Sequence, residues 1–274
     1  MVSKKMLGLL LVLPALVMIG VFFILPLIAS VIGAFETPEG AGLSNFVKAR
    51  ELYSEDILFS VLIVTLASLL IGFFAIAIGG YLTLGENPRA VAILRWLYRW
   101  PLFIPFIVVG QTLRTFLARN GLMNNMLVGS GLITPDQALS FLDWRGIVIA
   151  FVWKQTPFVA LLVAGAMASI DRGTIEAARN LGASRPRILI EIVVPQVLVT
   201  LTVGLILSFV TMMSVLSVPL MINAQSPTMI TADIAFRINA YGDYGVANAL
   251  GFISLIITST VAWLYLKLSV KERS

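Results

Sequence analysis

Long apolar segments separated by short polar ones dominate the chain. Four of them contain no charged residue, namely Met6–Phe35, Ile57–Gly85, Ile192–Ala232 and Tyr244–Leu266. Two more each contain one cation away from their ends, namely Trp96–Ala118 with Arg114, besides Arg99 near its start, and Gly146–Ile170 with Lys154. A helix of roughly 20 apolar residues crosses a hydrocarbon layer about 30 Å thick. The pattern therefore predicts an all-α integral membrane protein with six transmembrane helices.

The composition excludes a soluble globular protein. Of the 274 residues, 59% are hydrophobic and 12% are charged, whereas soluble chains average about 25% charged residues. The first apolar segment is about twice as long as the apolar region of a cleaved signal peptide, roughly 7–15 residues. We expect it to remain as a membrane anchor, and residues 1–274 to form a single polytopic transmembrane domain.

Basic residues in the connecting segments predict the orientation, because cytoplasmic loops carry an excess of Lys and Arg. With the N-terminus inside, twelve cations fall on the inner side and five on the outer side. The inner ones are Lys4, Lys5, Arg89, Arg95, Arg99, Arg172, Arg179, Arg185, Arg187, Lys267, Lys271 and Arg273. The outer ones are Lys48, Arg50, Arg119, Arg145 and Arg237. Both termini are thus predicted to be cytoplasmic, and topology rather than nucleic-acid binding accounts for the net charge of +5.

The residue inventory leaves little material for catalysis. The chain has no cysteine and no histidine, which excludes Cys/His metal sites, cysteine nucleophiles and histidine acid–base chemistry. It also lacks a Gly-x4-Gly-Lys-Ser/Thr phosphate-binding loop. We therefore expect no catalytic residue, no metal site and no cofactor in this chain, which is not an enzyme by itself.

Between the fourth and fifth predicted spans, the sequence predicts a helix, a turn and a second helix. Asp171 is suited to cap the first helix, and Gly182 stands where a helix C-terminus favours glycine. Pro186 falls in the first turn of the second helix, where its missing N–H is harmless. Three residues share the apolar face of the first helix: Ile175, Ala178 and Leu181. Such a projecting amphipathic helix is suited to a groove in a partner protein.

This segment resembles a known family. Permease subunits of binding-protein-dependent ABC importers carry the signature Glu-Ala-Ala, three residues, Gly, nine residues, Ile-x-Leu-Pro. The chain matches this signature with Glu176-Ala177-Ala178, Gly182, Ile192 and Pro195, and has Val194 in place of the leucine. The resemblance implies a type I ABC importer permease fold. The stretch from Ala232 to Gly251 resembles most the polyamine, iron and phosphonate branch of these importers.

The resemblance implies specific partners. Residues 171–191 are expected to form a cytoplasmic coupling loop that docks on an ATPase subunit, with Glu176, Ala177, Ala178 and Gly182 as the coupling residues. ATP and Mg²⁺ would be bound by that partner. The complex would contain two ATPase subunits, a second permease subunit of different sequence and an extracytoplasmic solute-binding protein, in the lipid of the cell inner membrane. Ordinary helix capping and packing also explain Ala178 and Gly182.

Polar residues inside the predicted spans are candidates for the solute pathway, because charge within a bilayer is costly. They are Gln111, Arg114, Lys154, Gln155 and Ser214. Two alternatives remain open: the cations extend to the membrane interface or pair with neighbouring helices, and Ser214, with Thr211 and Ser217 on one face, holds helices together. The prolines at 14, 26, 101, 105, 157 and 219 equally allow hinges or ordinary packing.

The substrate class is only weakly indicated. No predicted span contains Asp or Glu, and Val215–Pro219 lacks an acidic residue that polyamine relatives often have there. An anionic or neutral solute is favoured, and a polyamine remains possible. The main alternative is an ion-coupled secondary transporter acting without an ATPase, which would be expected to show intramembrane carboxylates and an inverted repeat. We find neither in the sequence.

Overall fold

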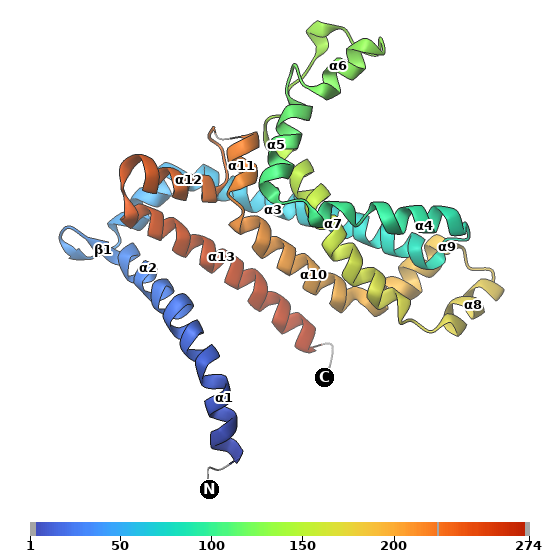
Figure 1. The fold of residues 1–274 in the computed structure, drawn as a ribbon, viewed down its shortest axis with the longest axis horizontal. Helices are drawn as coiled ribbons and strands as arrows, with labels where there is room; N and C mark the ends of the chain where they lie inside the picture. Colours follow the sequence, from blue (N-terminus) through green and yellow to red (C-terminus); the bar gives the residue numbers. More distant parts are fainter. Residues whose placement is uncertain (1–3, 224, 272–274) are drawn as a thin grey trace. The chain divides into compact units, whose positions relative to one another are not determined.

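The computed structural model describes residues 4–223 and 225–271, and Arg273, counted above among the inner cations, lies outside them. Within this part of the chain all regular secondary structure is helical except for a hairpin of β1 (Glu36–Thr37) and β2 (Gly40–Ala41). The chain forms two compact units (Figure 1). Unit 1 is Met1–Ser54 with Asp233–Ile257, and unit 2 is Glu55–Ala232 with Thr258–Ser274.

Unit 1 begins with one helical run made of α1 (Lys4–Ile19), the π-turn η1 (Gly20–Ile24) and α2 (Leu25–Phe35). The hairpin leads to the start of α3 (Ser44–Leu84), and the chain returns through the end of α12 (Ile230–Phe236), η5 (Arg237–Tyr241) and the first part of α13 (Tyr244–Lys271). The rings of Phe35, Phe46 and Phe252 meet with centroids 4.8 to 5.8 Å apart. Asn45 donates from Nδ2 to the carbonyls of Ala34 at 3.1 Å and Glu36 at 2.8 Å, which fixes the corner after α2.

Unit 2 contains the rest of α3, the start of α12, the end of α13 and eleven further helical segments. In chain order these are α4 (Pro88–Leu97), η2 (Trp100–Phe103), α5 (Phe106–Leu117), α6 (Leu122–Gly129), η3 (Pro135–Gln137), α7 (Trp144–Ala168), α8 (Arg172–Asn180), α9 (Arg185–Ile188), η4 (Leu189–Val193), α10 (Val194–Ser214) and α11 (Ser217–Ile222). The core lies where α7 packs on α10. Gly204 of α10 lets the two helices approach closely, because a Cβ there would lie 3.3 Å from Val159 and Leu162 of α7.

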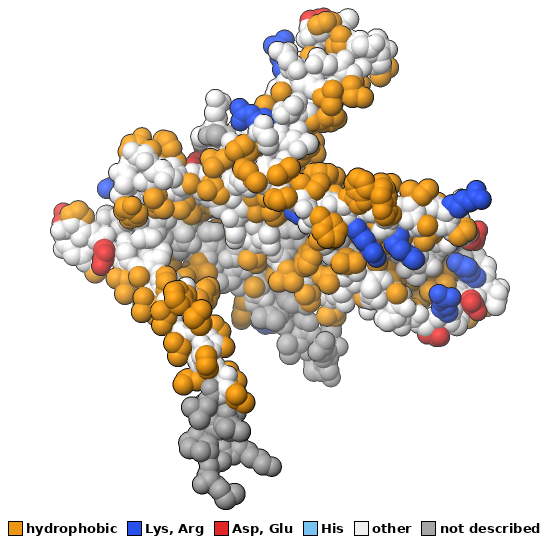
Figure 2. All heavy atoms as spheres, in the orientation of Figure 1, with side chains coloured by type: hydrophobic (Ala, Val, Ile, Leu, Met, Phe, Trp, Pro, Cys, Tyr) orange, Lys and Arg blue, Asp and Glu red, His pale blue; other side chains and the backbone are white. Residues whose placement is uncertain are grey.

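Five helices among the described residues are long and apolar enough to cross a membrane: Leu11–Phe35, Ser44–Leu84, Trp144–Ala168, Arg185–Ser214 and Tyr244–Leu264. A sixth crossing requires Pro88–Phe103 and Phe106–Gly129 to act together, although they are bent by 105°. The all-helical membrane fold is therefore confirmed with five or six spans. Figure 2 shows apolar side chains over much of the visible face of unit 2, whereas charged ones gather at the end formed by α4, α8 and α9.

The predicted span over Trp96–Ala118 is not one continuous helix. The segment is divided among the end of α4, η2 and α5, with the break at Ile104 and Pro105. Ile104 is extended, with φ −94° and ψ 120°, because the ring of a following proline disfavours helical backbone. Pro105 therefore breaks the helix, whereas Pro14 and Pro157 lie inside helices that continue through them.

The predicted span over Ile192–Ala232 is also interrupted. α10 ends at Ser214, and Val215 is extended with ψ 119°, because the ring of Pro219 would clash with the carbonyl four residues earlier in a continuous helix. The freed Val215 carbonyl accepts a hydrogen bond from Thr231 Oγ1 at 3.0 Å. Ser217 begins α11 and thus does not extend the α10 face that carries Thr211 and Ser214.

Candidate functional site

The predicted coupling loop begins with α8, a short helix with a well-formed N-terminus. The Asp171 carboxylate accepts hydrogen bonds from the backbone N–H groups of Gly173 at 3.2 Å and Thr174 at 3.1 Å. These bonds hold the pKa of Asp171 below its usual value. Ile175 and Ala178 face inward and are buried. The predicted N-cap and two of the three predicted apolar positions are thereby confirmed.

The turn after α8 closes in a Schellman motif. Gly182 has φ +81°, its N–H donates to the Arg179 carbonyl at 2.9 Å, and the Ala183 N–H donates to the Ala178 carbonyl at 3.0 Å. The turn carries Leu181 away from the buried face, so that 88% of this side chain is exposed. The prediction that Leu181 shares the face of Ile175 and Ala178 is therefore wrong, because the helix has already ended.

The coupling residues lie on this capped projection. Glu176 and Ala177 are exposed on α8, Ala178 packs inward, and Gly182 forms the turn. Beyond the turn, α9, η4 and α10 form one helical run of 30 residues, Arg185–Ser214. At the start of this run, Arg185 forms an ion pair with Glu86, which follows α3. A short projecting helix is thus joined by a tight turn to a long helix of membrane-spanning length.

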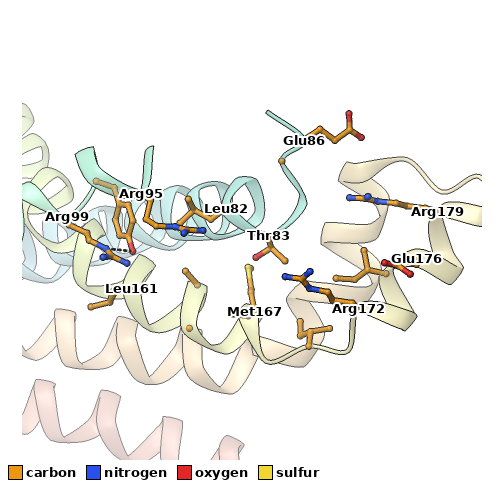
Figure 3. Close-up of a pocket in the computed structure, with 17 residues that line it drawn as sticks. Leu82, Thr83, Glu86, Arg95, Arg99, Leu161, Met167, Arg172, Glu176 and Arg179 are labelled. Carbon is orange, nitrogen blue, oxygen red and sulfur yellow. Dashed lines mark hydrogen bonds between the residues drawn. The ribbon is translucent and has the colours of Figure 1, made fainter. Parts of the chain in front are cut away.

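A cavity of about 670 Å³, which we call the arginine pocket, lies between α8, the ends of α3 and α7, and α4 with the residues after it. Figure 3 shows Arg95 and Arg99 on the α4 side and Arg172, Glu176 and Arg179 on the α8 side, with Leu82, Thr83 and Met167 between them. The pocket is therefore rich in guanidinium groups and adjoins the predicted coupling helix.

The two intramembrane cations have separate partners. Lys154 Nζ donates to the carbonyls of Pro101 at 2.8 Å and Leu102 at 3.0 Å, and it lies 5.5 Å from the Phe106 ring centroid. Arg114 donates from Nη1 to the Met221 carbonyl at 2.9 Å. Arg114 lies eight residues beyond Phe106 on α5, about 12 Å further along the helix. Each cation thus joins two helical segments, and the two contacts lie at different heights along α5.

The remaining pathway candidates are dispersed. Gln155 is buried in α7, whereas Gln111 is exposed on α5. Ser214 donates to the Val210 carbonyl in its own helix at 2.9 Å. None of the five candidates lines the arginine pocket or the second large cavity of unit 2. Their role in a solute pathway remains a prediction.

A buried carboxylate that the sequence does not single out lies on α3. Asp56, 3% exposed, accepts hydrogen bonds from the Thr228 N–H at 2.6 Å and from Ser226 Oγ at 3.2 Å. One turn later, Ser60 Oγ accepts from the Ile230 N–H at 2.8 Å. Together these contacts hold the segment before α12 against α3. The spacing of Asp56 and Ser60, on one helix face next to the apolar run, was the available signal.

A sequence model of the family described as "Binding-protein-dependent transport system inner membrane component" matches residues 75–271. The trehalose/maltose transport system permease protein MalF of Thermococcus litoralis is 29% identical over 95% of this chain and 92% of its own length. The spermidine/putrescine transport system permease protein PotB of Escherichia coli is 30% identical over 56% of this chain and 55% of its own length.

Solved structures agree on the fold. The chain resembles a subunit of a bacterial alginate ABC transporter in complex with an alginate pentasaccharide-bound periplasmic protein, with a TM-score of 0.83 and 21% identity over 98% of this chain and 95% of that one. It also resembles a chain of the MetNI methionine ABC transporter, with a TM-score of 0.60 and 17% identity over 80% of this chain and 95% of that one. The chain belongs to the family of binding-protein-dependent transport system inner membrane components and has the fold of an ABC importer permease.

Proposed function

We propose that this permease subunit forms half of a solute pathway and docks on an ATPase subunit through residues 171–191. The observation that carries the proposal is the capped projection described above. An 88% exposed Leu181 beside Gly182, next to exposed Glu176 and Ala177, presents a small apolar tip with one acidic group. Exposed apolar groups on a rigid element are suited to insertion into a groove of a partner.

The mechanical connection supports this role. The projection continues directly into the 30-residue run Arg185–Ser214, and α7, which precedes α8, packs against α10 in the core of unit 2. A displacement of α8 by a partner would therefore be transmitted to two helices of membrane-spanning length. Close-packed interfaces of this kind shift as units rather than deform gradually.

The rest of the assembly is proposed on the same basis. Two ATPase subunits bind ATP and Mg²⁺, a second permease subunit of different sequence completes the pathway, and an extracytoplasmic binding protein delivers the solute. The charged end at α4, α8 and α9 faces the cytoplasm, as do both termini. The excess of inner Lys and Arg residues supports this orientation.

For the substrate, we propose a neutral or anionic carbohydrate. The relative aligned along 95% of the chain is named for trehalose and maltose. The buried carboxylate of Asp56, at the start of the apolar part of α3, already accepts hydrogen bonds from Ser226 and Thr228. A polycation would thus gain little from this subunit. A polyamine is the second candidate, because PotB is named for spermidine and putrescine.

The docking proposal is tested with a matched pair of exposed leucines. Leu181→Ser removes the apolar tip, and Leu132→Ser alters a leucine that is 73% exposed in the turn after α6. We expect only Leu181→Ser to reduce copurification of the ATPase subunit and solute-stimulated ATP hydrolysis in proteoliposomes. Uptake by the chain alone, with no ATPase subunit present, would instead support the ion-coupled secondary transporter and refute the proposal.

A further inference from the structure

Two adjacent cavities of unit 2 share a wall residue. Next to the arginine pocket lies an apolar groove of about 580 Å³ between α3, α4 and α7. Phe74 and Ile78 of α3, Leu94 and Leu97 of α4, and Val152 and Trp153 of α7 are among its lining residues. Tyr98 lines both the groove and the arginine pocket. A charged space and an apolar space are therefore joined along one short helix.

The charge of the arginine pocket favours an anion. Its lining contains the guanidinium groups of Arg95, Arg99, Arg172 and Arg179 against the carboxylates of Glu86 and Glu176. Glu86 is already paired with Arg185 from outside the pocket lining. Within the described part of the chain, no carboxylate forms an ion pair with any of the four arginines. Guanidinium groups recognise phosphate through paired N–H donors.

The sequence of α4 and of the residues that follow it to Trp100 places these spaces at a membrane surface. Arg95 and Arg99 line the pocket, and Leu94 and Leu97 line the groove. Trp96 and Trp100 are exposed by 59% and 52%, and their rings pack with centroids 4.3 Å apart. Exposed tryptophan beside arginine is typical of the boundary between lipid headgroups and acyl chains. Residues 94–100 thus lie between the charged arginine pocket and the apolar groove. The same change from polar to apolar surroundings occurs in a bilayer between the headgroups and the acyl chains.

We propose that this region binds an anionic phospholipid, with its phosphate in the arginine pocket and an acyl chain along the apolar groove. A soluble phosphate compound has no acyl chain to occupy the apolar groove. An uncharged lipid has no anionic group to pair with the arginines. Basic pockets between membrane helices are suited to anionic headgroups. The lipid site shares α8 with the proposed docking surface. Its test measures lipid retention, whereas the docking test measures assembly with the ATPase subunit, so the two proposals can fail separately.

The test is native mass spectrometry of the purified, delipidated transporter complex titrated with lipids of identical acyl chains. We expect phosphatidylglycerol to be retained in preference to phosphatidylcholine. Arg95→Gln and Arg172→Gln should each weaken phosphatidylglycerol retention about fivefold, as expected for one basic group near an anionic headgroup. Arg95→Lys should retain part of the preference. Arg89→Gln is the matched control, because Arg89 lies on α4 outside both cavity linings.

The groove is tested separately by Val152→Trp, which fills it from α7. We expect this variant to lose phosphatidylglycerol while its weak binding of soluble glycerol phosphate is unchanged. Equal retention of the two lipids, or equal losses in Arg95→Gln and Arg89→Gln, would overturn the proposal. Full displacement of the lipid by glycerol phosphate would show a free phosphate site instead. If a partner subunit protects these arginines from chemical modification when lipid is absent, the pocket is a protein contact. That result would also overturn the lipid proposal.

Discussion

Gly182→Val is the most informative single change in the proposed docking element. Gly182 has φ +81°, and a Cβ at this position would meet nothing within 4 Å. The cost of the substitution therefore arises from the backbone and not from a clash. A left-handed conformation costs a residue with a Cβ roughly 1–2 kcal/mol, and relief of this strain would open the Schellman turn that presents Leu181.

If docking requires the native turn, the variant has to restore the strained conformation when it binds the ATPase subunit. The strain energy then weakens the binding free energy by the same amount. A loss of 1–2 kcal/mol corresponds to a factor of about 5–30. The assay is a titration of the solubilised permease with its ATPase subunit, read as the concentration that gives half-maximal assembly. We expect that concentration to rise by about 5–30-fold for Gly182→Val. Gly182→Asn should behave nearly as the parent, because asparagine tolerates this conformation.

The chain provides a matched control for strain alone. Gly131 follows α6 with φ +74°, has nothing within 4 Å of an added Cβ, and closes the same motif. Its N–H donates to the Val128 carbonyl, and the Leu132 N–H donates to the Leu127 carbonyl, both at 3.0 Å. Gly131→Val should leave assembly unchanged. Equal effects of the two valine variants, or none for Gly182→Val, would refute the docking argument.

Three further substitutions test contacts seen in the structure. Asp56→Ala leaves the buried Thr228 N–H without its acceptor and should lower stability by about 1–3 kcal/mol, measured as a lower Tm in detergent. Lys154→Met removes the donor to two η2 carbonyls and should also lower Tm, with partial recovery in Lys154→Arg. The Arg145 guanidinium holds the pKa of the Asp143 carboxyl below its usual value. The ionised Asp143 carboxylate therefore stabilises the fold fully above about pH 4, and this stabilisation is lost as the pH falls through the lowered pKa. The Tm of Asp143→Asn should accordingly fall less steeply than that of the parent below that pH.

Local rules predicted the elements of the proposed site correctly. Asp171 as an N-cap and Gly182 as a left-handed C-terminal residue are each determined by the backbone groups that a helix end leaves free. The apolar runs likewise predicted the membrane helices. The position of Leu181 was missed because a one-residue difference in where the helix ends moves a side chain from the buried face to the tip.

Other features depend on contacts distant in sequence. Pro105 breaks its helix whereas Pro157 lies in a continuous one, so a proline in the sequence does not by itself predict a break in a membrane helix. Asp56 meets Thr228 across 172 positions, a separation at which a single sequence carries no pairing signal. The sequence makes Lys154 a pathway candidate, but its carbonyl partners Pro101 and Leu102 lie more than 50 positions away in η2 and cannot be identified from the sequence.

Site-specific crosslinking from position 181 tests the docking of this permease on an ATPase most directly. The chain contains no cysteine, so Leu181→Cys introduces its only thiol, which is labelled with a photoactivatable maleimide before the permease is assembled with its partner subunits. We predict a crosslink to a subunit that carries a Gly-x4-Gly-Lys-Ser/Thr loop, and none from Leu132→Cys. Crosslinks from position 181 only to lipid or to the solute-binding protein would contradict the account.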